Sequence, residues 1–496
     1  MKPIQSLLIA ACSLLSVATG WSAMDSEFEI HMPGFAELDE NWNTMKPGGE
    51  TSCVHGDEYQ FFVFPGDPKK LKIYFNGGGG CWNAQLCSPD HEPTPYLQTI
   101  GQDQNPAWMA RQFGAAPGVL DHTHPDNPFA EYTMIHVPYC TGDLHLGNRD
   151  VEYALLNDDS SELTFTIRHR GQTNVGAVLG WVYQNFEAPE AVFISGGSAG
   201  GMAVAYYLSV LANHYSGAQV VALADDIGSY RAREMEGVNH RQWGIPHVLA
   251  DQGRWGTLWE NGFDMADLII RGGSGLGNGQ IHLFDHAHDS AQLAYIQMVS
   301  GQSANVLGLI DANREVIRQK LPDLRSYIAG GMKHTILFDP LFYKVQTDGV
   351  SIWDWVAAIA AGDEVQDIHC SHCIRTGFVF DEDDLKIIGH AIELLSVPGQ
   401  WNPQQSGPRC PPNAQTFSLV CAVIDGARSA DALTAVSPIM VWYPAALWEV
   451  INASAERLDE YSMLAPLTYN NRPDATREEM VELLKAVREI IVLALY

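Results

Sequence analysis

The chain has 496 residues, of which 46% are hydrophobic and 10% aromatic, and it carries a net charge of −30 from 59 acidic and 29 basic side chains. Such a composition can bury a large core, which excludes disordered and fibrous proteins. The strongly negative field repels phosphates and anionic lipid surfaces, so we expect no nucleic-acid partner and no binding to a charged membrane, and a neutral, largely esterified substrate is easier to attract.

Residues 1–20 have the three parts of an export signal, which are the basic residue Lys2, an apolar run over 7–17 and small residues at 18–20. The apolar run is too short to span a bilayer. Two other interpretations are a buried first helix and a lipoprotein cleavage box that ends at Cys12. We predict a signal peptide over 1–20 and an exported protein, periplasmic or extracellular, whose membrane contact would be limited to a lipid anchor at Cys12.

Eight cysteines remain once Cys12 is removed with the signal. An even number of cysteines in an exported chain predicts disulfides. Their short spacing favours Cys81 with Cys87 and Cys410 with Cys421, and the remaining connectivity is open. The other four cysteines are Cys53, Cys140, Cys370 and Cys373.

After a polar leader over 21–52, runs with strand composition alternate with segments of helical periodicity. The strand runs are 71–75, 132–137, 191–194, 219–224, 281–284 and 326–329, and the clearest helical segments between them are 172–183 and 200–211. This alternation predicts an α/β fold in which a mostly parallel sheet has helices on both faces.

Two further segments complete the predicted organisation. Residues 231–280 are rich in Trp, Gly and Arg with weak periodicity, and we interpret them as an insertion or lid within a catalytic domain that spans 53–375. Residues 376–496 are predicted to be a helical extension packed on that domain, because 474–495 repeats apolar residues with a helical period. The sequence does not specify an oligomeric state.

The strongest motif is the sequence G-G-S-A-G at 196–200, which follows an apolar strand and opens a helical segment. A serine between small residues at such a strand-to-helix turn is typical of the nucleophile elbow of α/β-hydrolases. A glycine-rich turn with an incidental serine is the alternative. The flanking strand and helix favour Ser198 as a nucleophile.

A glycine loop, N-G-G-G-G at 76–80, follows the first strand run. In this architecture an early loop and the residue after the nucleophile donate N–H groups to the oxyanion. We therefore predict an oxyanion hole formed by Gly78, Gly79 and Ala199, although the donor within 77–80 is not determined. A phosphate-binding loop is disfavoured because no Lys-Ser/Thr pair follows the glycines.

The serine needs a base and an orienting acid, and this fold usually presents them in the order Ser, Asp, His. His334 lies in a loop after the last strand run, where the base is expected. The acids near strand ends are Asp225, Asp226, Asp285 and Asp289, and the other downstream histidines include His282, His286, His288, His369 and His372.

Two segments invite a metal interpretation, the His/Asp cluster over 282–289 and H-C-S-H-C over 369–373. Structural zinc sites often pair one Cys-x2-Cys with a second, and this chain has no second one. We interpret these residues as a disulfide and loop histidines, and we predict no metal and no cofactor.

Taken together, the motifs resemble the pectin acetylesterase and Notum family of secreted carboxylesterases, especially its bacterial members. The residues that carry the resemblance are C-V-H-G at 53–56, F-N-G-G-G-G-C-W at 75–82, N-P-F at 127–129, V-P-Y-C-T-G-D-L-H-L-G at 137–147, H-R-G-Q-T-N at 169–174, G-G-S-A-G-G at 196–201, D-S-A-Q-L at 289–293 and His334.

The resemblance implies an α/β-hydrolase-like fold, no metal, and a catalytic triad of Ser198, Asp289 and His334, because Asp289 and Gln292 match the family's Asp-x-x-Gln motif. The chain has Gly197 where many relatives have cysteine, and its glycine loop continues differently from the plant and animal forms. Beyond about residue 375 nothing matches.

The predicted activity is a carboxylic ester hydrolysis through an acyl-enzyme, with an acylated carbohydrate or a small ester as substrate and acetyl as the leading acyl group. The alternatives are a lipid or small-molecule esterase, a peptidase or thioesterase on the same elbow, and a non-catalytic polysaccharide-binding relative. The last is suggested by 13 tryptophans that could stack on sugars.

Overall fold

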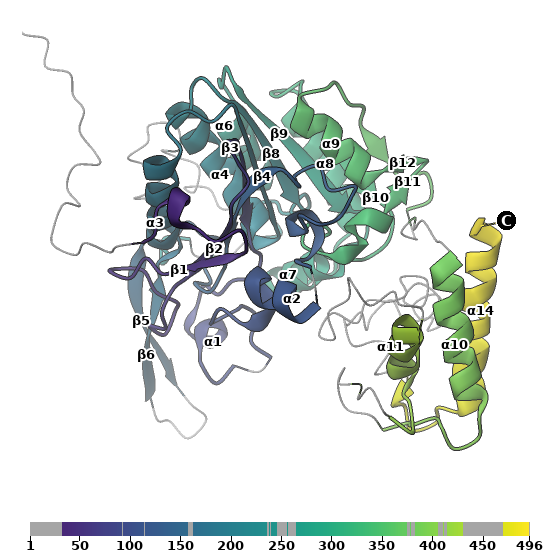
Figure 1. Cartoon of the computed structure of the whole chain (residues 1–496). Coiled ribbons are helices and arrows are strands. Elements are labelled where there is room, and N and C mark those ends of the chain that lie inside the picture. The colour runs from purple at the N-terminus through teal and green to yellow at the C-terminus, as the bar shows by residue number, and fades with distance from the viewer. Residues whose placement is uncertain are drawn as a thin grey trace, which may run out of the picture. The chain divides into compact units, whose positions relative to one another are not determined.

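The structure is a computed structural model that describes residues 32–91, 93–113, 115–156, 162–235, 238, 240–245, 255, 264–373, 377, 382–404, 410, 414–429 and 470–495. The predicted signal peptide over 1–20, with Cys12, lies outside these residues. A nine-stranded sheet forms the centre, in the order β1-β2-β4-β3-β7-β8-β9-β10-β13 (Figure 1).

Most of this sheet is parallel, which confirms the predicted fold class. Strands β4, β3, β7, β8, β9, β10 and β13 pair in parallel, and β1 and β2 add an antiparallel edge. The strands are β1 (Asn43–Met45), β2 (Phe61–Phe64), β3 (Asp67–Phe75), β4 (Tyr132–Val137), β7 (Ala191–Gly197), β8 (Gln219–Asp225), β9 (Gly279–His286), β10 (Ser326–Ala329) and β13 (Ile368–His369).

Alternating side chains of these strands enter two separate hydrophobic clusters. On β3, Leu71 and Ile73 belong to one cluster, while Tyr74 belongs to the other. Successive side chains of a strand point to opposite faces, so the two clusters lie on the two faces of the sheet. Burial on both faces explains why the central strands read as nearly continuous apolar runs.

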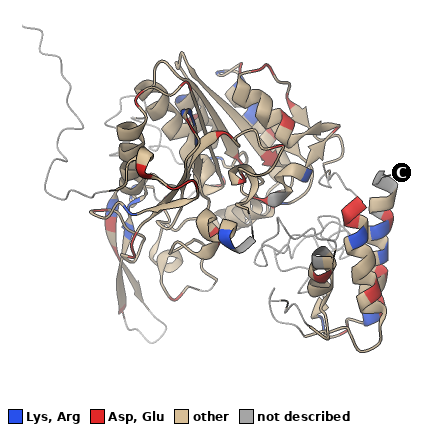
Figure 2. Ribbon diagram, in the orientation of Figure 1, with Lys and Arg blue, Asp and Glu red and all other residues tan. Residues whose placement is uncertain are grey.

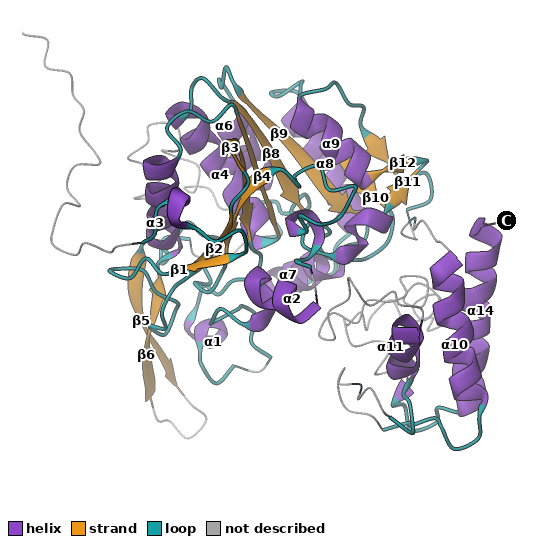
Figure 3. Cartoon of the chain, in the orientation of Figure 1, coloured by secondary structure: helices purple, strands orange, loops and turns teal. Residues whose placement is uncertain are grey.

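Helices cover both faces, as predicted (Figure 3). Helices α3 (Gly171–Asn185), α4 (Ala199–His214), α6 (Met265–Gly273) and α8 (Val306–Arg318) contribute to the first cluster, and α2 (Pro106–Phe113) and α9 (Ile352–Ala361) to the second. The other helices that the structure describes here are α1 (Ala84–Cys87), α7 (Ser290–Ser300) and the 3-10 helices η1 (Phe35–Glu37), η2 (Gln102–Gln104), η3 (Gly118–Leu120) and η4 (Pro340–Lys344).

All six strand runs expected from the sequence coincide with or lie within observed strands, and both clear helical segments lie within α3 and α4. The strands that were not predicted from the sequence are short or amphipathic. One of them, β1, comes from the predicted polar leader. The others are β2, β13, the hairpin of β5 (Arg149–Leu156) with β6 (Glu162–His169), and the pair β11 (Gln346–Thr347) with β12 (Val350–Ser351).

The predicted insertion over 231–280 contains regular structure at its end. Asp264 caps α6, which packs against α4, and residues 279–280 begin β9. Residues 264–278 are therefore the last part of the crossover between β8 and β9. Residues 236–237, 239, 246–254 and 256–263 of the predicted lid lie outside the described residues.

Among the described residues after 381, three helices form, namely α10 (Glu382–Ser396), α11 (Leu419–Ser429) and α14 (Arg477–Leu495). They share a hydrophobic cluster of their own, which includes Ile388, Leu395, Val423 and Leu484. Charged side chains are spread along α10 and α14, whereas the central strands are mostly uncharged (Figure 2). None of the helices within the described ranges is long and apolar enough to cross a membrane.

The eight cysteines form four disulfides, Cys53–Cys140, Cys81–Cys87, Cys370–Cys373 and Cys410–Cys421. The two pairs favoured by spacing are confirmed. The Cys370–Cys373 disulfide also agrees with the interpretation of 369–373 as a disulfide. The long-range pair Cys53–Cys140 could not be chosen from sequence, because its partners are 87 residues apart.

Candidate active site

Ser198 occupies the single residue between β7, which ends at Gly197, and α4, which begins at Ala199. Its φ of 54° and ψ of −123° lie outside the regions that side chains normally adopt. The residue is half-buried, and its N–H donates to the Asp225 carbonyl at 2.9 Å. The turn predicted from G-G-S-A-G is thus a strained elbow that holds the hydroxyl at the carboxyl edge of the sheet.

Glycines make this elbow sterically feasible. A Cβ on Gly200 would lie 2.1 Å from the Phe75 carbonyl oxygen, and a Cβ on Gly196 would lie 2.6 Å from Gly200 backbone atoms. Both distances are far below van der Waals contact with backbone that cannot rotate away. The first turn of α4 therefore packs directly on the end of β3, which brings the glycine loop that follows β3 to the serine.

The glycine loop lies against the elbow. A Cβ on Gly77 would be 3.0 Å from the Ser198 Cβ, and Gly78 and Gly79 have φ values of 152° and 72°. Within the described part of the chain, the N–H groups of Gly78, Gly79 and Ala199 donate to no protein acceptor. The N–H groups of the three predicted oxyanion donors therefore have no described protein acceptor, and Gly77 is the loop residue that contacts Ser198.

Contacts on both sides anchor this loop. Leu97 donates its N–H to the Gly78 carbonyl at 2.8 Å, and the Gly80 N–H donates to the Tyr295 hydroxyl at 3.3 Å. Tyr295 in turn donates to the Pro95 carbonyl. Because Tyr295 belongs to α7, the loop is tied to the helix that begins at Asp289.

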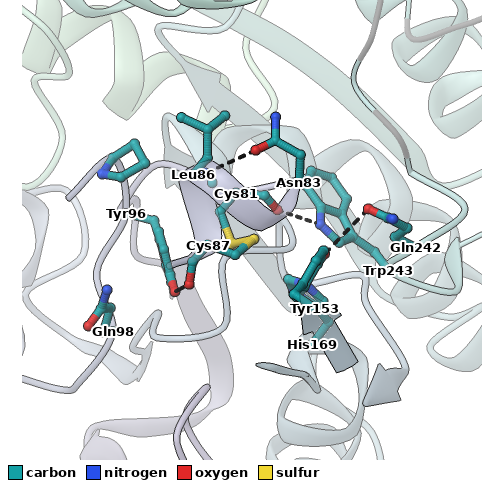
Figure 4. Close-up of a disulfide and its surroundings, with 12 residues drawn as sticks. Cys81, Asn83, Leu86, Cys87, Tyr96, Gln98, Tyr153, His169, Gln242 and Trp243 are labelled. Carbon is teal, nitrogen blue, oxygen red and sulfur yellow. Dashed lines mark hydrogen bonds between the residues drawn. A yellow bond between two sulfur atoms is a disulfide. The ribbon is translucent and has the colours of Figure 1, made fainter. Parts of the chain in front are cut away.

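The Cys81–Cys87 disulfide follows directly after the glycines (Figure 4). The Cys81 N–H donates to the Gly142 carbonyl at 3.1 Å, and the Cys81 carbonyl accepts from the Trp243 indole at 2.7 Å. His169 and Tyr153 are hydrogen-bonded to each other at 3.2 Å nearby. The exit of the glycine loop is therefore fixed covalently and by backbone hydrogen bonds.

Asp289 is the N-cap of α7 and is fully buried. Its Oδ1 accepts the N–H groups of Ala291 and Gln292 at 2.8 and 3.0 Å, and its Oδ2 accepts from the Gln292 side chain at 3.0 Å. A helix N-terminus and several donors stabilise an ionised carboxylate. The Asp-x-x-Gln spacing is explained by this cap, since Gln292 lies one turn into the helix that Asp289 begins.

His334 donates from Nδ1 to Asp289 Oδ2 at 2.7 Å. A carboxylate only accepts, so the bond assigns the proton of the neutral ring to Nδ1 and leaves Nε2 as an acceptor. Burial lowers the pKa of His334, but the carboxylates of Asp289 and Asp226 outweigh it and raise the pKa to about 9. About a quarter of the His334 side chain is exposed.

The His334 loop touches the elbow. A Cβ on Gly197, the residue before Ser198, would lie 2.8 Å from the Thr335 Cγ2, and Thr335 directly follows His334. The same loop is tied to the start of α7, because Ser290 donates its N–H to the Met332 carbonyl at 3.1 Å. Ser198, Asp289 and His334 therefore lie on segments that meet at one edge of the sheet.

The other candidate acids are buried below this edge. Asp225 accepts the N–H groups of Ile336 and Leu337, and Asp285 accepts the Gly228 N–H at 2.7 Å. Burial raises the pKa of both carboxyl groups to about 7. Neither contacts the imidazole of His334.

Sequence reasoning assigned no role to Gln292 beyond the motif, and none to Tyr295 or Thr335. Gln292 binds Asp289, Asp285 and Ser229, so it connects three segments of the site. The position of Tyr295 six residues after Asp289, on the same helix, was the available signal. Its contact with the glycine loop depends on tertiary structure.

Of the two segments that invite a metal interpretation, 369–373 brings ligand atoms of His369, Cys370 and Cys373 within 4.8 Å of one another, whereas 282–289 spreads its side chains over two faces of the sheet. On β9, His282 and His286 point to the face of Phe284, while Asp285 points to the opposite face with Leu283. His286 pairs instead with Asp226 at 2.8 Å. In 369–373, Cys370 and Cys373 are joined to each other, and His369 lies 3.3 Å from Asp311.

The comparison with family models agrees with the resemblance found in the sequence. Residues 47–253 match the model of the pectinacetylesterase family, and this range contains the glycine loop and Ser198. Among solved structures, the Wnt deacylase Notum from Drosophila is similar at 18% sequence identity and a TM-score of 0.47, over 65% of this chain and 94% of that one. No curated protein matches the sequence.

Proposed function

We propose that this protein is an exported serine esterase that removes an acyl group, in the first place acetyl, from an acylated carbohydrate or a related small ester. The observation that carries the proposal is the hydrogen bond between buried Asp289 and His334, whose loop touches the strained Ser198 elbow. The pectinacetylesterase match over 47–253 supports the ester chemistry, and four disulfides support export.

In the first step the Ser198 Oγ attacks the ester carbonyl carbon while His334 Nε2 takes the hydroxyl proton. Asp289 holds the ring through Nδ1 and stabilises the imidazolium. The C–O bond to the alcohol then breaks, and His334 returns its proton to the leaving oxygen. An acyl-enzyme on Ser198 remains.

The negative charge on the carbonyl oxygen develops beside the N–H groups of Gly78, Gly79 and Ala199. Fixed donors at this position stabilise the tetrahedral intermediate without reorganisation, and removing one such donor typically costs about 10²–10³-fold in rate. The positive end of α4 points at the same oxygen and adds to the effect.

In the second step water attacks the acyl carbon, His334 accepts the water proton, and the carboxylic acid leaves as Ser198 regains its proton. The neutral imidazole is the active form in both steps. Because the pKa of His334 is raised, activity should increase with pH towards about 9.

The test is hydrolysis of p-nitrophenyl acetate and of longer p-nitrophenyl esters by the purified wild type and by Ser198→Ala. We expect Ser198→Ala to lose activity by at least about 10⁴-fold with unchanged thermal stability. Ser209→Ala is the matched control, because Ser209 is a buried serine on α4 that bonds the Tyr206 carbonyl and should keep full activity.

Chain-length preference separates an acetylesterase from a lipid esterase, and turnover of matched amides and thioesters would reveal a peptidase or thioesterase. A folded wild type that is inert on every ester would overturn the proposal and leave carbohydrate binding as the function to test. Burial weighs against that alternative for most of the described tryptophans, because Trp42, Trp82, Trp181, Trp243, Trp255 and Trp355 are buried and cannot stack on a sugar, whereas Trp108, Trp353 and Trp401 are partly exposed.

A further inference from the structure

Asp226 lies at the carboxyl end of β8, where the parallel neighbours β8, β9 and β10 all end beneath the proposed site. It is fully buried, and its φ of 55° is a left-handed conformation that residues other than glycine rarely adopt. Such a backbone conformation persists when surrounding contacts hold it.

These contacts join Asp226 to two other segments. Its Oδ1 accepts the backbone N–H of His286 at 2.6 Å, and its Oδ2 accepts from His286 Nδ1 at 2.8 Å and from the Thr335 N–H at 2.5 Å. Thr335 also has a left-handed φ, of 59°, directly after His334. One carboxylate therefore holds the end of β9 and the loop that carries the imidazole.

Asp226 also places a second carboxylate beside the proposed acid and base. One side-chain oxygen of Asp226, one of Asp289 and one ring nitrogen of His334 all lie within 4.8 Å of one another. A carboxylate this close favours the imidazolium form of a histidine, and low solvent exposure strengthens the effect.

We propose that Asp226 is a positioning residue of the esterase site, which fixes the His334 loop through Thr335 and adds a second negative charge beside the His334–Asp289 pair. This inference rests on the proposed function. Asp226 touches no reacting atom in it, so its effect on catalysis passes through His334.

Other titratable groups surround the pair, and the test must separate their effects. They are Asp225, Tyr230, Asp285, His286, Asp289 and Lys333. Burial and the nearby Asp289 carboxylate raise the pKa of Asp226, whereas the imidazolium of His334 and the His286 N–H lower it. Burial lowers the pKa of His286 to about 4, so this ring is neutral and donates its Nδ1 proton.

The experiment compares pH profiles of p-nitrophenyl acetate hydrolysis for the wild type and Asp226→Asn. An asparagine has one acceptor oxygen and no charge, so it cannot keep all three hydrogen bonds. We expect the apparent pKa of the ascending limb to fall by about one unit, kcat on the alkaline plateau to fall by about 10-fold, and KM to change by less than about 3-fold.

Asp121→Asn is the matched control for removing a buried carboxylate that holds a turn. Asp121 accepts the Thr123 N–H at 2.9 Å and the Thr123 hydroxyl at 2.6 Å, away from the site. The Asp121→Asn variant should have a lower melting temperature and an unchanged pH profile. If Asp226→Asn behaves in the same way, with only its stability reduced, Asp226 is structural and the inference is wrong.

A second measurement tests the inference even if Asp226→Asn does not fold. The His334 imidazole can be titrated by NMR in the folded wild type, with the signal assigned by its loss in His334→Gln. A pKa above about 8 supports the second carboxylate, and a pKa near or below the usual 6.5 overturns the inference. Because this titration needs no turnover, it also distinguishes failure of the inference from failure of the proposed function, which Ser198→Ala tests.

Discussion

The two halves of the proposed site are built on different physical principles. The nucleophile half, residues 76–80 and 196–201, contains no charged side chain, and its geometry depends on glycines that allow α4 to pack against the end of β3. The acid–base half, Asp226, Asp289 and His334 with their supports, consists of buried ionisable groups held by hydrogen bonds. Steric exclusion positions the first half, and electrostatics positions the second.

This difference predicts how each half responds to change. The nucleophile half should tolerate changes of pH and charge but no added atoms. Isosteric substitutions in the acid–base half should leave the fold intact but strongly change the catalytic rate.

Asp289→Asn should have the largest effect, a loss of about 10⁴-fold in kcat with the fold retained. Asparagine is a good N-cap, so residue 289 should still cap α7. Its amide can donate to His334 Nδ1, which would move the ring proton to Nε2 and remove the base. Steady-state hydrolysis of p-nitrophenyl acetate and the melting temperature check this.

Asp264→Asn provides the control, since Asp264 caps α6 by accepting the Ala266 N–H at 3.0 Å. It should leave kcat unchanged. Equal, small losses in both variants would mean that Asp289 acts only as a helix cap.

Gly200→Ala tests the steric half. The new Cβ would meet the Phe75 carbonyl oxygen at 2.1 Å, so the elbow or β3 must shift, and we expect a loss of about 3 kcal/mol in the free energy of unfolding together with most of the activity. Urea denaturation and ester hydrolysis measure the two effects.

Gly176→Ala is the matched helix substitution, because a Cβ there meets no atom within 4 Å. It should stabilise α3 by up to about 1 kcal/mol. If Gly200→Ala were as well tolerated, the proposed steric basis of the nucleophile half would be wrong.

Asp285→Asn should stabilise the protein in a pH-dependent manner. Burial raises the pKa of Asp285 to about 7, so the unfolded chain releases this proton before the folded one, and the free energy of unfolding falls as pH rises from about 4 to 7. Asparagine removes this penalty, and we expect a gain of about 2 kcal/mol at pH 8 that largely disappears at pH 4.

Denaturation of wild type and variant at both pH values checks the sign. Asp285 Oδ2 has no hydrogen-bond partner among the described residues, which favours a neutral side chain there. An equal stability difference at pH 4 and pH 8 would show that the carboxyl group does not titrate as expected.

Tyr295→Phe should have the smallest effect, because it acts on the junction between the halves. Loss of the hydroxyl removes the bond to the Gly80 N–H and frees the glycine loop from α7. We expect kcat to fall by about 10-fold and KM to stay nearly constant, since the oxyanion donors matter most in the transition state.

Tyr215→Phe is the comparison, since the Tyr215 hydroxyl donates to the Phe186 carbonyl at 2.9 Å in a buried position at the other end of α4. It should cost stability but not kcat. A rise in KM with unchanged kcat for Tyr295→Phe would assign Tyr295 to substrate binding instead.

Much of the fold was predictable because its signals are local. Strands β3, β4 and β7–β10 are apolar runs whose side chains are buried on both faces of the sheet. The segments of α3 and α4 between strands show helical periodicity. The edge strands β1 and β2, the β5–β6 hairpin and the short β13 were missed, because strands exposed on one face or only a few residues long carry a weak pattern.

The elbow at Ser198 follows from the sequence alone, because strand, small residues, serine and helix are contiguous and only a glycine fits beside the end of β3. Strand position left the choice open among Asp225, Asp226, Asp285 and Asp289, since all four are buried near the ends of neighbouring strands, and Asp289 was predicted only through the family resemblance. Only the folding of the 330–335 loop onto the start of α7 brings His334 within hydrogen-bonding distance of Asp289. Local sterics can be read along the chain, whereas the pairing of buried charges is decided by which segments the fold brings together.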